Sequence, residues 1–210
     1  MAETEIQAPI FEFTGNHVCL DFINTVQDRS TSPRELLNSY NDLVTWSQEA
    51  HILTENEARQ LQEEATQRTT EAAVVLQKAI HLREALYHIL LAFIMGSSAQ
   101  EADVVTFNAL LSEAMARACL VPKESGFAWD WSNKEKALGR MLWPLVRSAA
   151  DLLTSEKLDD VRVCASEDCM WMFLDTSKNH SRRWCDMKSC GNRAKVRKHY
   201  SQKKQTGHNH

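Results

Sequence analysis

The chain has 210 residues, of which 43% are hydrophobic and 25% charged, as is typical of a soluble globular protein with one ordinary domain and a small second module. It contains no secretory hydrophobic segment and no apolar run of the roughly 18 residues that a membrane span needs, so we expect no membrane partner and a reducing, cytoplasmic location. The net charge of −4 conceals an asymmetry: residues 176–210 hold ten lysines and arginines against one aspartate, a net charge of +9, whereas residues 1–175 carry −13. A polyanion should therefore bind one end of the chain and be repelled by the other.

The first patterned segment is the apolar run Val18–Ile23, for which we expect a helix that begins near Asn16. Asp21 and Asn24 are three residues apart and would share a face of that helix. They either hold a polar ligand or form an internal hydrogen-bonded cap, and the internal cap is the preferred interpretation.

Four capping-box patterns predict helix starts after Ser32, Thr54, Ser98 and Ser132. With the apolar periodicity, they predict helices over residues 33–49, 55–67, 70–95, 99–117 and 133–155. The third is apolar on nearly all sides and is expected to be the central helix, and the last should kink at Pro144. Between the last two, residues 119–121 and 127–131 are expected to form a small hairpin.

Arg83 lies in the apolar third helix and needs an anionic partner. It either binds the carboxylate or phosphate of a small effector or forms an internal salt bridge to an acid such as Asp21 or Glu84, which we prefer. Trp143 and Arg147 are four residues apart, so the cation could lie over the indole or both could line a cavity, although packing is again preferred. The residues of a possible effector pocket are thus Asp21, Asn24, Arg83, Trp143 and Arg147.

Four of the six cysteines form two C-x4-C pairs, Cys164 with Cys169 and Cys185 with Cys190. A single Zn²⁺ takes four thiolates in a tetrahedron, which two such pairs can supply, with scattered free thiols as the alternative. The other two cysteines, Cys19 and Cys119, are expected to be small buried residues. A zinc ion held by four thiolates has no open position for a substrate, and the chain contains no phosphate loop, nucleophile elbow, H-E-x-x-H or dinucleotide motif. We therefore do not expect an enzyme.

The cysteine region predicts strands at residues 161–163 and 170–174, then a basic helix that begins at Gly191. On that helix, Val196 and Tyr200 would pack on the zinc site while the cations project along two flanks. The alternatives are a solvated basic surface or docking on acids of the helical domain. The predicted nucleic-acid-binding residues are Arg182, Arg183, Asn192, Arg193, Lys195, Arg197 and Lys198.

The run W-C-D-M-K-S-C-G-N-R-A-K, residues 184–195, resembles the CGNR zinc-finger family, whose name corresponds to residues 190–193 of this chain. Proteins of that family commonly carry an N-terminal helical domain, ABATE, with an L-D-x-x-N-T motif. The matching residues here are Leu20, Asp21, Asn24 and Thr25. The resemblance implies a bacterial transcription regulator with a finger that binds double-stranded DNA.

We therefore expect a mainly α fold with a multihelical N-terminal domain, residues 1–158, and a four-cysteine zinc-finger module, residues 159–210, made of a short β-hairpin and a basic helix. The expected function is zinc-dependent, DNA-binding transcription regulation, with one structural zinc ion. The helical domain would sense a small-molecule effector or form a homodimer. The alternative is a protein-interaction or RNA-binding finger. About 45 residues bury too little apolar area to fold alone, so metal should decide whether the C-terminal module folds.

Overall fold

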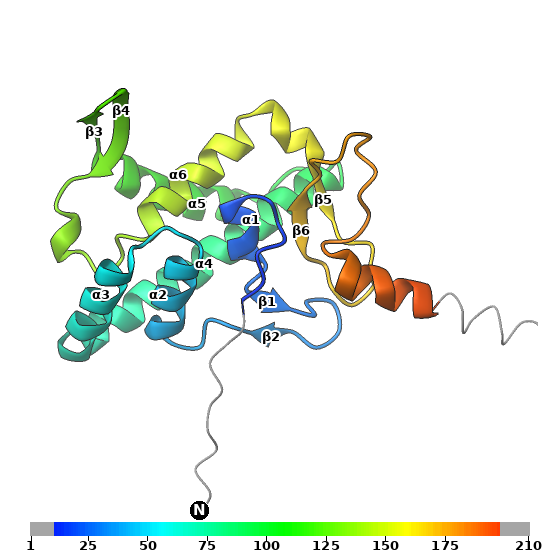
Figure 1. Ribbon diagram of the computed structural model, residues 1–210, viewed down its shortest axis with the longest axis horizontal. Coiled ribbons are helices and arrows are strands. Elements are labelled where there is room, and N and C mark those ends of the chain that lie inside the picture. Colours follow the sequence, from blue (N-terminus) through cyan, green and yellow to red (C-terminus); the bar gives the residue numbers. More distant parts are fainter. Residues whose placement is uncertain (1–10, 198–210) are drawn as a thin grey trace, which may run out of the picture.

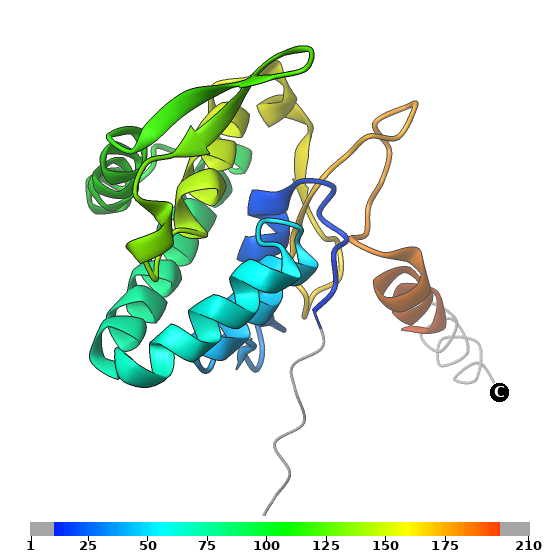
Figure 2. The same cartoon turned by 60° about the vertical axis from the view of Figure 1, so that its left-hand side comes forward.

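The computed structural model describes residues 11–197, apart from the side chain of Lys136, and shows a helical body with a smaller extension at its C-terminal end (Figures 1 and 2). The helices of the body are α1 (Val18–Ile23), α2 (Tyr40–Glu49), α3 (Glu55–Gln67), α4 (Thr69–Ile94), α5 (Glu101–Met115) and α6 (Leu142–Leu153). Helix α4 contacts each of the other five, and its buried residues include Leu82, Leu86 and Leu90. The predicted mainly α fold and central helix are confirmed.

Within residues 11–197, three two-stranded antiparallel sheets accompany the helices. The first pairs β1 (Val26–Gln27) with β2 (Arg34–Glu35), and the second pairs β3 (Ala118–Lys123) with β4 (Gly126–Trp131). The third pairs β5 (Val161–Val163) with β6 (Met172–Leu174), placing Val161 opposite Leu174. The β3–β4 and β5–β6 hairpins are where the sequence predicted them. Short 3-10 turns, η1 (Lys134–Lys136) and η2 (Glu156–Asp160), precede α6 and β5.

The predicted helix over residues 33–49 is too long, because α2 begins only at Tyr40. Ser39 caps it: its side chain accepts a hydrogen bond from the Asp42 backbone N–H, and the Asp42 carboxylate accepts one from the Ser39 N–H. Glu35, the expected partner of Ser32 in a capping box, is instead in β2, and its carboxylate binds Arg83. A tertiary ion pair and a strand contact therefore override the local helix signal.

The predicted helix over residues 133–155 is also too long, since α6 begins at Leu142. Asn133 has a left-handed backbone with φ of 55°, and only the short turn η1 follows it. Pro144 consequently lies in the first turn of α6, where the absence of its N–H is tolerated, so the predicted mid-helix kink is wrong. Of the four predicted capping boxes, the one at Thr54 is confirmed, whereas α5 is preceded by Gln100 rather than capped by Ser98.

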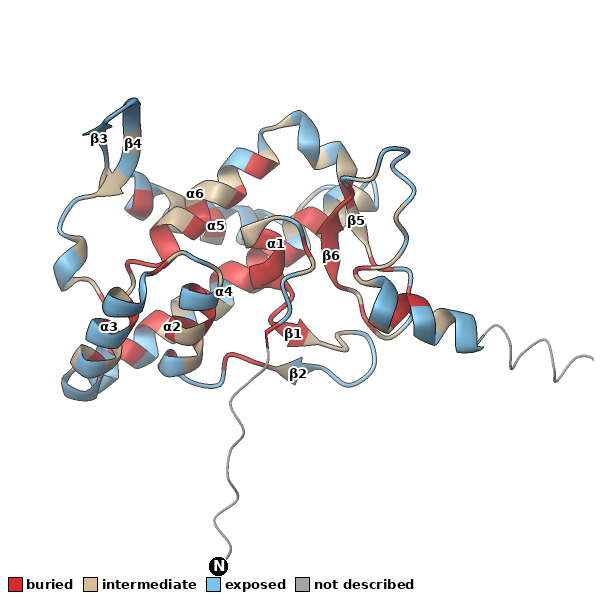
Figure 3. Cartoon of the chain, in the orientation of Figure 1, coloured by how far each residue is buried: buried red, intermediate tan, exposed pale blue. Residues whose placement is uncertain are grey.

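The hydrophobic core of the body continues into the C-terminal extension. Val161, Met172 and Leu174, on β5 and β6, belong to the same buried cluster as the core residues of α1, α4 and α6 (Figure 3). The four cysteines of the extension form a second buried cluster with Trp171 and Phe173. The β5–β6 hairpin is therefore built onto the helical body rather than joined to it by a linker.

Within residues 11–197, no helix combines the length and the apolar character required to cross a lipid bilayer.

Candidate metal centre and nucleic-acid interface

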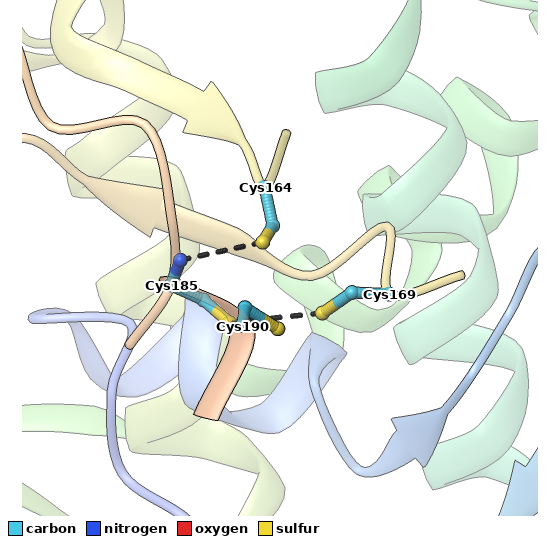
Figure 4. A group of neighbouring side chains, drawn as sticks. All are labelled: Cys164, Cys169, Cys185 and Cys190. Atoms are coloured by element: carbon cyan, nitrogen blue, oxygen red, sulfur yellow. Dashed lines mark hydrogen bonds between the residues drawn. The ribbon is translucent and has the colours of Figure 1, made fainter. Parts of the chain in front are cut away.

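The four cysteine side chains of the C-terminal extension point toward one another (Figure 4). Their sulfur atoms all lie within 4.8 Å of one another, and all four residues are buried. The Sγ of Cys185 is 3.6 Å from the Sγ of Cys169 and 3.6 Å from that of Cys190. Four thiolates about 2.3 Å from one Zn²⁺ would be separated by about 3.8 Å, whereas a disulfide needs about 2.05 Å. The geometry fits one structural zinc ion.

Ionisation within this cluster is limited by the proximity of the thiols. Hydrogen bonds with Cys169 and Cys185 lower the pKa of Cys164. Hydrogen bonds with Cys164, together with burial, raise the pKa of Cys169 and Cys185. A divalent cation would remove this limit, since coordinated thiols are deprotonated outright. The donor set therefore suits a cation that prefers sulfur ligands.

Hydrogen-bond donors other than the thiols also contact the sulfurs. The backbone N–H of Cys185 lies 3.4 Å from the Sγ of Cys164, and Arg193 Nη2 lies 3.1 Å from the Sγ of Cys190. The interaction with Cys190 raises the pKa of the Arg193 guanidinium further above its usual range. Four thiolates around Zn²⁺ would carry two net negative charges, which such donors stabilise. Arg193 thus contacts the metal centre from the first turns of the basic helix.

The basic helix begins one turn earlier than predicted. A single π-helical turn, η3 (Met187–Gly191), comes first, and residues 192–197 continue as α-helix. Asp186 precedes this turn, and its side chain accepts a hydrogen bond of 2.7 Å from the Ser189 backbone N–H. Cys190 therefore lies inside the first turn, so the metal centre and the start of the helix are the same piece of structure.

Four of the predicted nucleic-acid-binding residues are exposed on this helix: Asn192, Arg193, Lys195 and Arg197. Arg197 forms ion pairs with Glu167 and Asp168 in the loop between the first two cysteines. Val196 is 54% exposed, so the prediction that it packs on the zinc site is wrong. Lys198 and Tyr200 lie outside the described residues.

The two arginines before Trp184 have different surroundings. Arg182 donates hydrogen bonds to the backbone carbonyls of Thr14, Trp184 and Cys185. Its guanidinium also lies over the ring of Phe173, 4.3 Å from the centroid. Arg183 is exposed and lies over the Trp184 ring. Of the two, only Arg183 presents its cation to an external partner, because the Arg182 guanidinium is occupied by backbone carbonyls.

Asp21 and Asn24 use their side chains to attach neighbouring segments to α1. The Asp21 Oδ1 accepts a hydrogen bond of 2.7 Å from Gly15 N–H. Asn24 pairs with both backbone groups of Met172 in β6, donating to its carbonyl and accepting from its N–H, each at 2.9 Å. A Cβ on Gly15 would stand only 3.0 Å from atoms of Leu20 and Asp21, so a larger residue would need these neighbours to shift by a few tenths of an ångström. These bonds are internal to the chain, as preferred from the sequence over a polar ligand, but the Asn24 side chain pairs with β6 instead of capping α1.

Arg83 is only 2% exposed and binds the Glu35 carboxylate through two hydrogen bonds of 2.6 Å. It also binds the expected Glu84, at 2.7 Å, and donates to the Thr25 hydroxyl. The other acid considered from the sequence, Asp21, is not its partner. Glu35 was missed because its local pattern indicated a helix start.

Trp143 and Arg147 do not contact each other as a cation and a ring. The guanidinium of Arg117 lies over Trp143, 4.9 Å from the ring centroid, and that of Arg147 lies over Trp129 at 5.2 Å. The five residues predicted to form an effector pocket therefore occupy separate environments: Asp21 on α1, Asn24 directly after it, Arg83 on α4, and Trp143 and Arg147 on α6.

The sequence reasoning also missed Trp171, whose indole N–H donates to the Val26 carbonyl at 2.8 Å. Together with the bonds of Asn24 to Met172, this contact attaches the finger to the segment after α1. The L-D-x-x-N-T motif was the available signal, because Asn24 and Thr25 are its last two members.

Comparison with protein families matches residues 16–156 to ABATE, described as "Putative stress-induced transcription regulator", and residues 161–203 to the CGNR zinc finger. A search of curated proteins found no match. The expectation from the sequence of an ABATE region followed by a CGNR finger is confirmed, and the four clustered cysteines lie within the finger match. The chain therefore belongs to the ABATE family and ends in a CGNR zinc finger.

Proposed function

We propose that the protein is a zinc-dependent transcription regulator whose helix at residues 187–197 binds double-stranded DNA. One observation carries this proposal: the metal centre includes the first turn of a helix whose polar and basic side chains after that turn are all exposed. A helix that is anchored at its first turn and exposes arginines is suited to the major groove. The regulator description of the ABATE family supports the same assignment.

Charge favours DNA as the partner of this end of the chain. The described part of the finger from residue 176 to 197 holds seven lysines and arginines and one acid. The first 175 residues carry −13, so a duplex would be steered toward the finger and away from the helical body. Arg183, Lys188 and Lys195, all exposed, are proposed phosphate contacts.

Arg193 and Arg197 are the proposed base-reading residues. Arg193 is held at the sulfur of Cys190, which ties its position to the metal centre. Arg197 is held by Asp168 and Glu167, so DNA must replace these two carboxylates with phosphate or base acceptors. The exposed Asn192 lies beside them, and its amide donates to the Lys188 carbonyl.

The metal is assigned a structural role, because four thiolates leave no coordination position for a substrate. We propose no catalytic activity. We propose that the helical body binds a small-molecule effector. We also propose that it forms a homodimer, because a single short finger reads few base pairs. The proposed setting is a bacterial cytoplasm, where the thiols remain reduced.

The test is fluorescence anisotropy of a labelled duplex from the region upstream of the gene, titrated with zinc-loaded protein against a scrambled duplex. We expect salt-sensitive binding that prefers the native duplex and disappears on zinc removal. The double variant Arg193→Ala/Arg197→Ala should bind about tenfold to a hundredfold more weakly. The control Arg59→Ala/Lys123→Ala removes the same charge from exposed positions on α3 and β3 and should leave affinity unchanged.

Equal binding by the wild type and the Arg193→Ala/Arg197→Ala variant would remove this helix from the interface. A preference for single-stranded RNA or for a protein over duplex DNA would instead support the alternative function. That alternative has one structural observation in its favour: Met187 and Val196 leave apolar surface exposed on the same helix.

A further inference from the structure

A cavity of about 180 Å³ lies between α4, α5, α6 and the turn that precedes α6. Its size is suited to a single ring or a short branched chain, because an apolar cavity of about 150 Å³ is enough to hold benzene. Most of its wall is apolar, and one aromatic ring contributes to it. Its apolar lining includes Val74, Val75, Leu110, Leu142, Trp143 and Val146.

Charged side chains also line this cavity, and one of the cations among them forms no salt bridge with a described residue. Lys78 forms a salt bridge of 3.0 Å with Glu113, and Glu71 forms one of 2.7 Å with Arg68, which is not a lining residue. Arg117 has no carboxylate partner among the described residues. Its guanidinium is held over the Trp143 ring, 4.9 Å from the centroid. A cation in this position can be neutralised by an anion in the cavity.

We infer that this cavity binds a small organic acid, with its apolar body against α4 and α6 and its carboxylate on Arg117. A guanidinium binds a carboxylate through two parallel hydrogen bonds, and its stacking on Trp143 holds the fork in place beforehand. The volume restricts the apolar body to about the size of one ring. The inference rests on the proposed function in one respect: the acid would be the effector that the helical body senses.

The cavity is connected to the finger through packed elements. Helix α6, which lines it, contacts α1, and α1 contacts β6. The residue after α1, Asn24, holds the Met172 backbone in β6 through its two hydrogen bonds. A ligand that moves α6 would therefore act on the helix to which the finger is attached.

The test uses the zinc-loaded full-length protein and benzoate as the probe, with isothermal titration calorimetry and tryptophan fluorescence as readouts. Benzoate should bind and change the tryptophan emission of the protein, because Trp143 lines the cavity. Benzyl alcohol, which has the ring without the charge, should bind at least about tenfold more weakly. Arg117→Ala should weaken benzoate binding by a similar factor and leave benzyl alcohol unaffected. Arg147→Ala is the matched control, because this cation lies over Trp129 and is not among the lining residues.

A second variant fills the cavity instead of removing its charge. A Cβ on Gly139 would stand 3.5 Å from the Val75 Cγ2, an ordinary contact between two lining residues, so Gly139→Leu adds volume inside the cavity. It should abolish binding of benzoate and benzyl alcohol alike while circular dichroism shows retained helix. If Gly139→Leu fails to fold, the comparison of the two ligands with Arg117→Ala decides the question.

Absence of benzoate binding by the wild type, or equal binding by wild type and Arg117→Ala, would overturn the inference. DNA anisotropy with the same samples separates this outcome from failure of the proposed function. Binding of DNA without binding of benzoate removes the acid site and leaves the regulator. Binding of benzoate without binding of DNA keeps the site and removes the DNA function.

Discussion

We predict that the contact between Asn24 and β6 contributes strongly to the stability with which the finger is attached to the helical body. Asn24 is 2% exposed. Its side chain forms hydrogen bonds of 2.9 Å with both the backbone N–H and the carbonyl of Met172, as a neighbouring β-strand would. In Asn24→Ala, both of these buried backbone groups lose their partner. An unpaired buried group costs about 1–3 kcal/mol, so the variant should lose about 2–6 kcal/mol of unfolding free energy. That is a large fraction of the about 5–15 kcal/mol of a typical domain.

Asn24→Asp tests the same contact at nearly constant volume. The carboxylate can still accept from the Met172 N–H, but its second oxygen would face the Met172 carbonyl in place of an amide donor. At neutral pH we expect a loss comparable to that of the alanine variant. The pKa of the new aspartate should be raised in the folded state. The lost stability should therefore return as pH falls toward the unfolded pKa of about 3.9, because the protonated carboxyl can donate.

The assay is urea unfolding at fixed zinc concentration, followed by tryptophan fluorescence and circular dichroism at several pH values. Asn179→Asp makes the same chemical change at an exposed finger residue and should stay within about 0.5 kcal/mol of wild type. Unfolding free energies of Asn24→Ala and Asn24→Asp as close to wild type as that control would refute the reasoning. So would a pH dependence of Asn24→Asp identical to that of wild type.

Three further predictions concern the metal, the DNA contacts and pH. Cys190→Ser or a strong chelator should release the zinc and the helix that starts around it, seen as lost metal content and reduced far-ultraviolet circular dichroism; Cys119→Ser, at an exposed cysteine outside the cluster, should change neither. The three proposed phosphate contacts predict that the logarithm of DNA affinity falls with the logarithm of salt concentration with a slope of about −3, and Lys188→Ala/Lys195→Ala should reduce its magnitude by about 2; a slope near zero in wild type would contradict phosphate binding. Burial raises the pKa of Asp21 to about 6, so its folded form favours the proton and stability is lost as pH rises from about 4 through 6. Asp21→Asn should therefore lack this loss of stability, which we expect to be about 3 kcal/mol. Urea unfolding at several pH values measures it, and a pH profile unchanged by the substitution would show that Asp21 is not the origin of the loss.

The helical periodicity was sufficient to predict α3, α4 and α5 nearly to their ends, because their apolar stripes and their breaks are local features of the chain. The predicted starts of α2 and α6 were wrong. A tertiary ion pair explains the first error, and a local backbone conformation explains the second. Glu35 pairs with Arg83, 48 residues away, and the left-handed Asn133 is followed only by the short turn η1, which ends at the extended Ala137 before α6 begins. The prediction that Cys119 is buried was also wrong, since it lies exposed on the β3–β4 hairpin, whereas Cys19 is fully buried as expected.

The metal site was the most predictable feature of the chain. Two C-x4-C pairs indicate four thiolates, and only the converging backbone was needed to bring their sulfurs within 4.8 Å. The surroundings of the arginines were not predictable, because spacing does not tell which carbonyls or rings a long side chain meets. Arg182 and Arg183 are adjacent in sequence, yet Arg182 donates hydrogen bonds to backbone carbonyls whereas Arg183 is exposed.

The sequence by itself determined the composition of this protein's parts: a helical body, four thiols spaced for one metal ion, and a basic C-terminal end opposed to an acidic remainder. Periodicity, ligand spacing and charge are properties of neighbouring residues, so they can be read along the chain. Only the tertiary structure decided how the parts are joined. Asn24 meets Met172 across 148 residues and Arg117 comes to lie over Trp143, and such contacts depend on which surfaces α1, α4 and α6 bring together when the core forms.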